Sequence, residues 1–328
     1  MAGVTERWTA TSPKGATTHD QSTQGKTARM TRLAGGAWLV LVLSWAGCAP
    51  AQEPYPFKLE SAKEEGGSVI RAHNQGAIPV SLHLRLTQAE NVASDVPFPI
   101  VVVVPPRTNL RVARIYPVEA GKAWRYRFDS RHRNGSYEAR HDPAATYRVP
   151  WRDGRTFVIG QAPGGKITTH FPPRDREAVD IPMPEGTPIV AARGGVVFDA
   201  VSEHSVGGPD ETLMSKANQV RVLHDDGTIG NYVHLMHGGV AVRAGEVVQA
   251  GKLLGYSGST GFSDGPHLHF AITRVVREGE SFGELSEPIT FYVGNPPYLF
   301  APRTGLVVTA NYVSPGQAPR MREALRAR

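Results

Sequence analysis

The segment GPHLHF at Gly265–Phe270 decides how this chain is interpreted. Its alternation is typical of a β-strand, on which residues two apart point to the same face. His267 and His269 are therefore expected to lie side by side on one strand. A metal ion needs several imidazole or carboxylate donors at one point, and a rigid strand would supply two of them here. A second strand-like segment, YVHL at Tyr232–Leu235, adds His234.

The composition of the chain predicts an all-β protein. Its 328 residues suffice for one large or two medium domains, and they include 35 glycines and 26 prolines among short β-branched runs. The formal net charge is +6, but residues 1–51 hold five Lys/Arg and two Asp/Glu, which leaves +3 for the rest. This charge is too small to predict a nucleic-acid partner, and no basic stripe is interleaved with aromatic residues.

The N-terminal region predicts export. Residues 1–29 are rich in Thr, Ser and Gly and are expected to be a non-native or unfolded leader. Residues 30–51 read as a signal peptide, because a charged start precedes the uncharged segment Leu33–Gly47. Cys48 is the only cysteine, and it stands where a lipid anchor would be attached in a bacterial lipoprotein; cleavage after Ala51 is the alternative. Either route predicts a periplasmic or cell-envelope protein.

Residues 52–158 are predicted to form an immunoglobulin-like β-sandwich. Val80–Thr87 alternates apolar and polar residues as a half-buried strand does, and Ser68–Ala72 is a second short strand. The intervening Asn74–Ala77 has the composition of a hairpin turn. Ile100–Val104 is apolar throughout and is expected to be buried on both faces. No catalytic pattern occurs in this domain.

Residues 159–300 are predicted to form a compact antiparallel β domain, with residues 301–328 as a C-terminal extension. Glycines separate its short strands, and Asp225–Gly227 is a strong turn signal. The polar loop Val201–Lys216 is long for such a domain. It is expected either to form one wall of a groove or to be a surface insertion.

Three ordered segments of this domain resemble one family. They are VDIPMPEGTPIVAARGGVV at Val179–Val197, HDDGTIGNYVHL at His224–Leu235 and GYSGSTGFSDGPHLHF at Gly255–Phe270. This set is similar to the lysostaphin-type (LytM-like) zinc endopeptidases, and the resemblance covers roughly residues 159–300. It implies an antiparallel β peptidase domain with zinc at the floor of a groove, and peptidoglycan peptides as the substrate.

The resemblance also implies three zinc ligands. Asp180 and His269 match the family's Asp and the second His of its His-x-His motif. The family's early His commonly stands four residues before the Asp, where this chain has Arg176. His170, ten residues before Asp180, is the nearest histidine upstream and is assigned as the third ligand. The alternatives to His170 are Asp175 and Glu177.

Catalytic roles follow from the same resemblance. Three protein ligands leave a fourth tetrahedral position for water, as in catalytic zinc sites. His234 and His267 match the family's proton-transfer residues, and imidazole suits that role because its pKa lies near neutral pH. Asn218 either lies near the site, as in the family, or is a plain strand-end residue. Within this domain, the histidines left without a role are His204, His224 and His237.

Through this resemblance, the sequence predicts a zinc endopeptidase that remodels the bacterial cell wall. It contains no His-Glu-x-x-His motif, no Gly-x-Ser-x-Gly motif and no phosphate-binding loop. One alternative is a non-catalytic module that binds the wall or activates an amidase, since such relatives lack zinc ligands or catalytic histidines. Another is an export-pathway chaperone built on the sandwich, which would leave the histidines unexplained.

Overall fold

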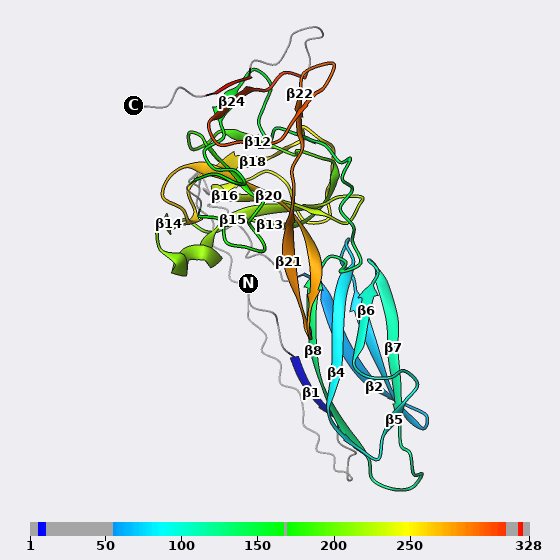
Figure 1. Ribbon diagram of the computed structural model, residues 1–328. Helices are drawn as coiled ribbons and strands as arrows, with labels where there is room; N and C mark the ends of the chain where they lie inside the picture. Colours follow the sequence, from blue (N-terminus) through cyan, green and yellow to red (C-terminus); the bar gives the residue numbers. More distant parts are fainter. Residues whose placement is uncertain (1–5, 11–54, 167–168, 313–320, 324–328) are drawn as a thin grey trace, which may run out of the picture.

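The computed structural model describes residues 6–10, 55–166, 169–312 and 321–323 (Figure 1). Except for one short 3-10 helix, all regular structure in these residues is β, so the predicted all-β class is confirmed. Within these ranges no helix has the length and apolarity needed to cross a bilayer. The predicted signal peptide and Cys48 lie outside them. Strand β1 (Glu6–Ala10) differs from the unfolded leader predicted for residues 1–29, because its backbone pairs with β8.

The N-terminal domain consists of two four-stranded sheets whose apolar faces share one core. Ile70 of one sheet and Leu84 and Phe128 of the other are buried together in it. That the pair has immunoglobulin-like connectivity remains a prediction. In spatial order the sheets are β1, β8 (Arg125–Asn134), β4 (Val80–Glu90) and β6 (Ile100–Val104); and β2 (Phe57–Glu64), β3 (Gly67–Asn74), β7 (Thr108–Tyr116) and β5 (Ala93–Ser94).

Two local predictions in this domain are wrong. Asn74–Ala77 does not close a hairpin, because β3 pairs with β2 and β7 whereas β4 pairs with β6 and β8 in the other sheet. The chain crosses between the sheets there, and the side chain of Asn74 donates hydrogen bonds to the carbonyls of Ile78 and Val104. β6 is an edge strand, so its three central valines are only partly buried.

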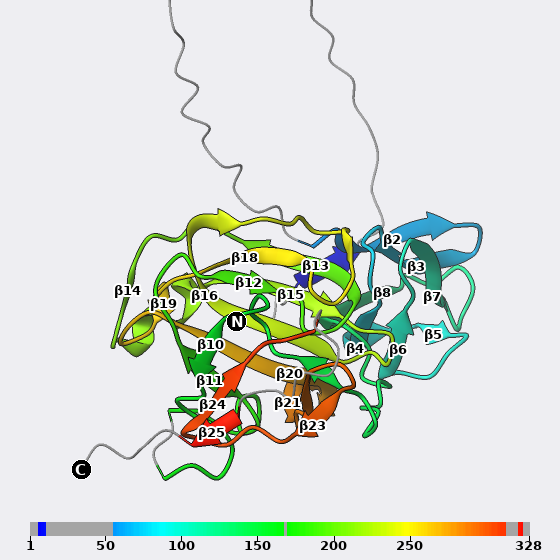
Figure 2. The same ribbon diagram turned by 90° about the horizontal axis from the view of Figure 1, so that it is seen from above.

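The C-terminal domain is built on one large sheet (Figure 2). Its buried core includes Trp151, Leu306 and Val308, so the domain extends beyond the predicted limits of 159 and 300. The main path runs β11 (Val179–Pro182), β20 (His267–Glu278), β16 (Ile229–Val240), β15 (Asn218–Leu223), β13 (Gly195–Val201) and β17 (Val247–Val248), while β21 (Ser281–Glu287) pairs with β20, and β12 (Pro188–Val190) pairs with β18 (Leu253–Ser257).

Smaller sheets complete this domain. Two three-stranded sheets each join a strand from the segment before residue 159 to two strands that follow residue 290. A short parallel pair lies next to the 3-10 helix η1 (Glu211–Lys216). The strands are β9 (Tyr147–Arg148), β22 (Phe291–Val293) and β23 (Tyr298–Phe300); β10 (Thr156–Val158), β24 (Leu306–Thr309) and β25 (Met321–Glu323); and β14 (Gly207–Gly208) with β19 (Gly261–Phe262).

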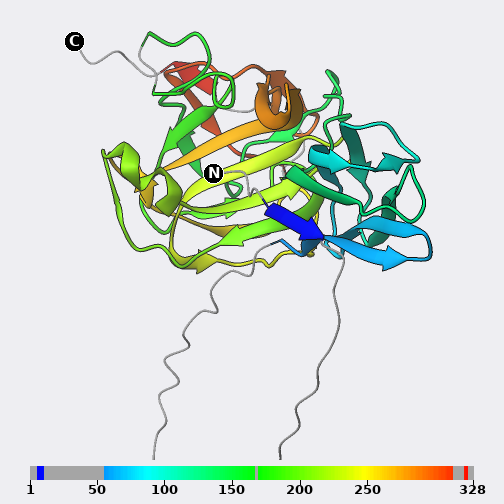
Figure 3. The same cartoon turned by 90° about the horizontal axis from the view of Figure 1, so that it is seen from below.

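The hairpin of β20 and β21 joins the two domains. It reaches along β8 of the N-terminal domain, and the views from the side and from below both place the domains next to each other (Figures 1 and 3). Ile78 of the N-terminal domain is buried with Val275 and Phe282 of the hairpin. Arg85 of β4 also forms an ion pair of 3.2 Å with Glu280 near the hairpin turn.

Candidate metal centre

Three neighbouring strands of the large sheet bring the predicted site residues together. Asp180 lies on β11, His267 and His269 on β20, and His234 on β16. The antiparallel register places Asp180 directly opposite His269. His170 comes from the loop that precedes β11 and enters the same place from outside the sheet. The fold thus brings all of these side chains together, whereas the strand pattern of the sequence predicts this only for the two histidines of β20.

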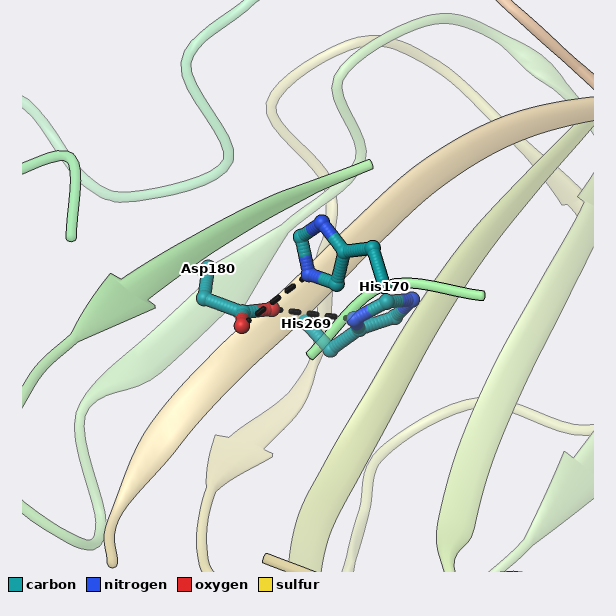
Figure 4. A group of neighbouring side chains, drawn as sticks. All are labelled: His170, Asp180 and His269. Atoms are coloured by element: carbon teal, nitrogen blue, oxygen red, sulfur yellow. Dashed lines mark hydrogen bonds and ion pairs between the residues drawn. The ribbon is translucent and has the colours of Figure 1, made fainter. Parts of the chain in front are cut away.

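The carboxylate of Asp180 faces two imidazole rings, those of His170 and His269 (Figure 4). One of its oxygens is 3.0 Å from Nε2 of His170, and the other is 2.9 Å from Nδ1 of His269. Each residue offers one donor atom, and these three atoms lie within 4.8 Å of one another. Two imidazole nitrogens and a carboxylate oxygen at this spacing fit a divalent metal of the zinc type.

The carboxylates around His269 also favour the binding of a cation. The carboxylates of Asp175 and Asp180 both face His269, at 3.4 Å from Nε2 and 2.9 Å from Nδ1. Burial by itself would lower the pKa of His269, but hydrogen bonds to these two carboxylates outweigh burial and raise it to about 9. Burial would raise the pKa of Asp180, yet its bonds to His170 and His269 lower it. The site therefore holds its carboxylates ionised.

The two acidic alternatives to His170 occupy other places. Asp175 contacts the Nε2 side of His269, which is the side away from Asp180. Such a carboxylate behind a ligand histidine typically fixes the orientation of its ring. Glu177 pairs with Arg176, and its backbone N–H donates to Ser286. Neither belongs to the group of donor atoms formed by His170, Asp180 and His269.

His234 and His267 stand next to this group with their ring centroids 4.6 Å apart. Nδ1 of His234 is 2.7 Å from the carbonyl of Thr260, and Nδ1 of His267 is 2.8 Å from the carbonyl of Gly265. A carbonyl can only accept, so each Nδ1 carries the hydrogen and each Nε2 keeps its lone pair. Burial lowers the pKa of His234 to about 3, which favours the neutral ring. The hydrogen bonds at Nδ1 thus leave Nε2 as the acceptor atom of each ring.

Backbone strain and a buried amide hold His234 in place. His234 has a φ of 65°, a conformation that residues other than glycine adopt rarely and that functional sites often contain. Its partner Thr260 is fixed in turn by Asn218, whose backbone N–H donates to Oγ1 of Thr260. The fully buried side chain of Asn218 also bonds the backbone of His204 and Leu235. Asn218 thus supports the site without lining it.

The group opens into a cavity of about 640 Å³. Phe171, Arg174 and other residues of the loop that carries His170 line one side, and residues of the loop Val201–Lys216 line another, which favours the wall over the surface insertion. Half-exposed Phe171 and Met214 stand on these two sides. Of the histidines without a predicted role, His204 lines the cavity, His224 is buried, and His237 is exposed.

Gln161 also supports the site, although no sequence pattern predicted it. Its backbone exchanges hydrogen bonds with Asp180, through N–H to carbonyl contacts of 3.2 and 3.0 Å. Its side-chain amide accepts a bond from the N–H of Thr169 at 2.9 Å and lies 3.3 Å from the Thr169 hydroxyl. One residue therefore aligns Asp180 with the residue that precedes His170. No local pattern marks this role, because it depends on pairing between distant segments.

Replacing Gln161 with leucine is expected to weaken metal binding about tenfold, as loss of a residue that orients ligands typically does. The substitution keeps the backbone bonds to Asp180 and removes both side-chain bonds to Thr169. Metal affinity measured by competition with a chelator would check this. Gln249→Leu is the matched control, since Gln249 is exposed next to the opposite edge strand β17. Equal affinity in the two variants would contradict the role of Gln161.

Comparison with known proteins points to one family. The model of Peptidase family M23 matches residues 174–282, a range that begins after His170. Lysostaphin of Staphylococcus staphylolyticus is 39% identical over 93 residues, which are 28% of this chain and 17% of that protein. Peptidoglycan DD-endopeptidase ShyA of Vibrio cholerae is 31% identical over 117 residues, 33% of this chain and 24% of ShyA. This chain thus spans less than a quarter of either relative's length.

A solved structure named for the same peptidase is also similar. The catalytic domain of lysostaphin from Staphylococcus simulans matches with 30% identity and a TM-score of 0.25. The match covers 36% of this chain and 78% of that domain.

Proposed function

We propose, from the premise that residues 174–282 are a Peptidase family M23 domain of the LytM type, that the protein is a zinc-dependent endopeptidase of bacterial peptidoglycan. One observation carries this proposal. His170, Asp180 and His269 bring their donor atoms together, and two further histidines with Nε2 lone pairs stand beside them in the same cavity. The name of the relative ShyA, a peptidoglycan DD-endopeptidase, supports peptide bonds of the cell wall as the substrate.

His170, Asp180 and His269 would hold the zinc ion. When bound, zinc polarises a carbonyl and lowers the pKa of water toward ~7. Asp180 would neutralise part of the ion's charge, and Asp175 contacts the ring of His269 on the side away from Asp180. Three protein donors leave room for one further ligand, as in catalytic sites.

His234 and His267 would move the protons of the reaction. Hydrolysis of a peptide bond requires that water lose a proton and that the leaving amine gain one. Each ring donates its Nδ1 hydrogen to a backbone carbonyl, which fixes the ring and leaves Nε2 as the proton acceptor. The two rings are adjacent, so a proton that one ring accepts at Nε2 from the attacking water can then be given to the leaving amine.

The alternative of a non-catalytic wall-binding or amidase-activating module fits the site less well. Such a module has no need for three metal donors and two oriented histidines in one cavity. Metal analysis separates the two proposals, because a binder without metal would contain no zinc.

Location belongs to the same proposal. The charged start and uncharged core of residues 30–51 favour export to the envelope, with a lipid anchor at Cys48 as one route and cleavage after Ala51 as the other. A substrate in the cell wall requires export by some route.

Purified sacculi incubated with the zinc-loaded protein should release shorter or uncrosslinked muropeptides. Mass spectrometry of the products would identify the bond, whether it lies in the stem peptide or in a cross-bridge. The Asp180→Ala variant with the same zinc addition is the control. Sacculi left intact by a wild-type protein that contains one zinc per chain would overturn the proposed activity.

A further inference from the structure

Strand β21 holds the loop that carries His170. The backbone N–H and the hydroxyl of Ser286 both donate to the carbonyl of Pro173, each at 3.0 Å. The hydroxyl oxygen of Ser286 also accepts a bond of 3.1 Å from the N–H of Glu177. His170 lies ten residues before Asp180, and a loop of this length needs such anchors because a flexible ligand loop would lose entropy whenever metal is bound.

Glu284, two residues earlier on β21, adds a charged anchor. Its side chain is almost fully buried and lies near three guanidinium groups. Arg221 of β15 is at 2.8 Å and Arg174 of the ligand loop is at 3.5 Å. Burial would raise the pKa of Glu284, but the arginines lower it to about 2, so the carboxylate is charged at neutral pH.

The third guanidinium comes from the other domain. Arg133 of β8 donates from Nη1 to Glu284 at 2.6 Å and from Nε to the carbonyl of Phe282 at 3.1 Å. Arg133 and Arg174 thus share one carboxylate, although the first belongs to the N-terminal domain and the second lies four residues after His170.

We propose that Glu284 positions the loop that carries His170, and that the N-terminal domain, through Arg133, sets how tightly the site holds zinc. This inference rests on the proposed zinc site. It gives the N-terminal domain a function that requires no contact with substrate. Any movement of that domain that withdraws Arg133 would leave Glu284 with two of its three guanidinium partners and loosen the loop.

The test compares two arginines that both cross the domain boundary. Arg133→Gln removes the link to Glu284, whereas Arg85→Gln removes the ion pair with Glu280, whose carboxylate forms no ion pair with the described residues of the ligand loop. Zinc affinity of the full-length variants is measured by chelator competition, with circular dichroism to check folding. Arg133→Gln is expected to weaken zinc binding about tenfold, in the range found for residues that orient metal ligands, and Arg85→Gln to leave it unchanged.

A double variant tests whether Arg133 affects zinc binding through Glu284 and Arg174. If Arg133 acts on the loop through Glu284 and Arg174, its removal from an Arg174→Gln background should weaken zinc binding less than its removal from the wild type. Additive losses, or equal losses in Arg133→Gln and Arg85→Gln, would overturn the inference while leaving the zinc site intact. A wild-type protein that binds no zinc would overturn the proposed function together with it.

Discussion

Replacing His269 with alanine is expected to remove bound zinc and peptide hydrolysis together. His269 supplies one of three donor atoms, and its removal leaves Asp175 and Asp180 without the ring that lies between them. Residues that merely orient metal ligands contribute about 10–100-fold to affinity, so loss of a ligand should cost more than that. Metal content after dialysis, followed by muropeptide analysis, would measure both effects.

The control for this experiment is His237→Ala. His237 is an exposed histidine of the same strand as His234 and is outside the donor group. It should keep one zinc per chain and full activity. If His269→Ala also keeps its zinc after dialysis, His269 is not a ligand and the proposed site is wrong.

Metal content after dialysis of His170→Ala tests whether His170 is the third zinc ligand. Its donor atom completes the group, so zinc should again be lost. Full zinc occupancy in this variant would move the assignment to an acidic residue, first to Asp175, which already contacts His269.

Local patterns predicted those parts of the molecule that depend on neighbours in sequence. The segment Val80–Thr87 became part of strand β4, and the His-x-His pair lies on β20, since the two-residue period of a strand is a local property. The predicted half-burial of Val80–Thr87 is wrong, because its polar residues Ser81 and His83 are buried as well. The all-β class followed for the same reason. These features need no knowledge of which strand pairs with which.

Pairing between distant segments was not predictable in this way. Asn74–Ala77 has hairpin composition, yet the strands on either side belong to different sheets because each buries its apolar face in the common core. Gln161 pairs with the backbone of Asp180, and Glu284 contacts Arg174, and both contacts join segments that no local pattern brings together. His170 was assigned by resemblance and distance from Asp180, and only the folded loop brings its Nε2 to that carboxylate.

Replacing His234 or His267 is expected to separate catalysis from metal binding. His234→Ala and His267→Ala are expected to keep zinc and to lose turnover by about 10²–10⁴-fold, the usual contribution of a proton-transfer residue. Neither residue belongs to the donor group, and each ring is held by its own backbone carbonyl. The loss should therefore appear in kcat, at unchanged metal content.

His204→Ala is the matched control, because His204 lines the same cavity while its hydrogen bonds to Asn218 use only its backbone. It should change turnover by no more than a few-fold. If His267→Ala loses zinc, His267 is a ligand. This is the strongest rival assignment, because Nε2 of His267 lies 3.9 Å from a carboxylate oxygen of Asp180. Near-normal cleavage by both His234→Ala and His267→Ala would contradict the proposed proton transfer. Among the described residues, no other imidazole outside the donor group packs against these two rings and could replace them.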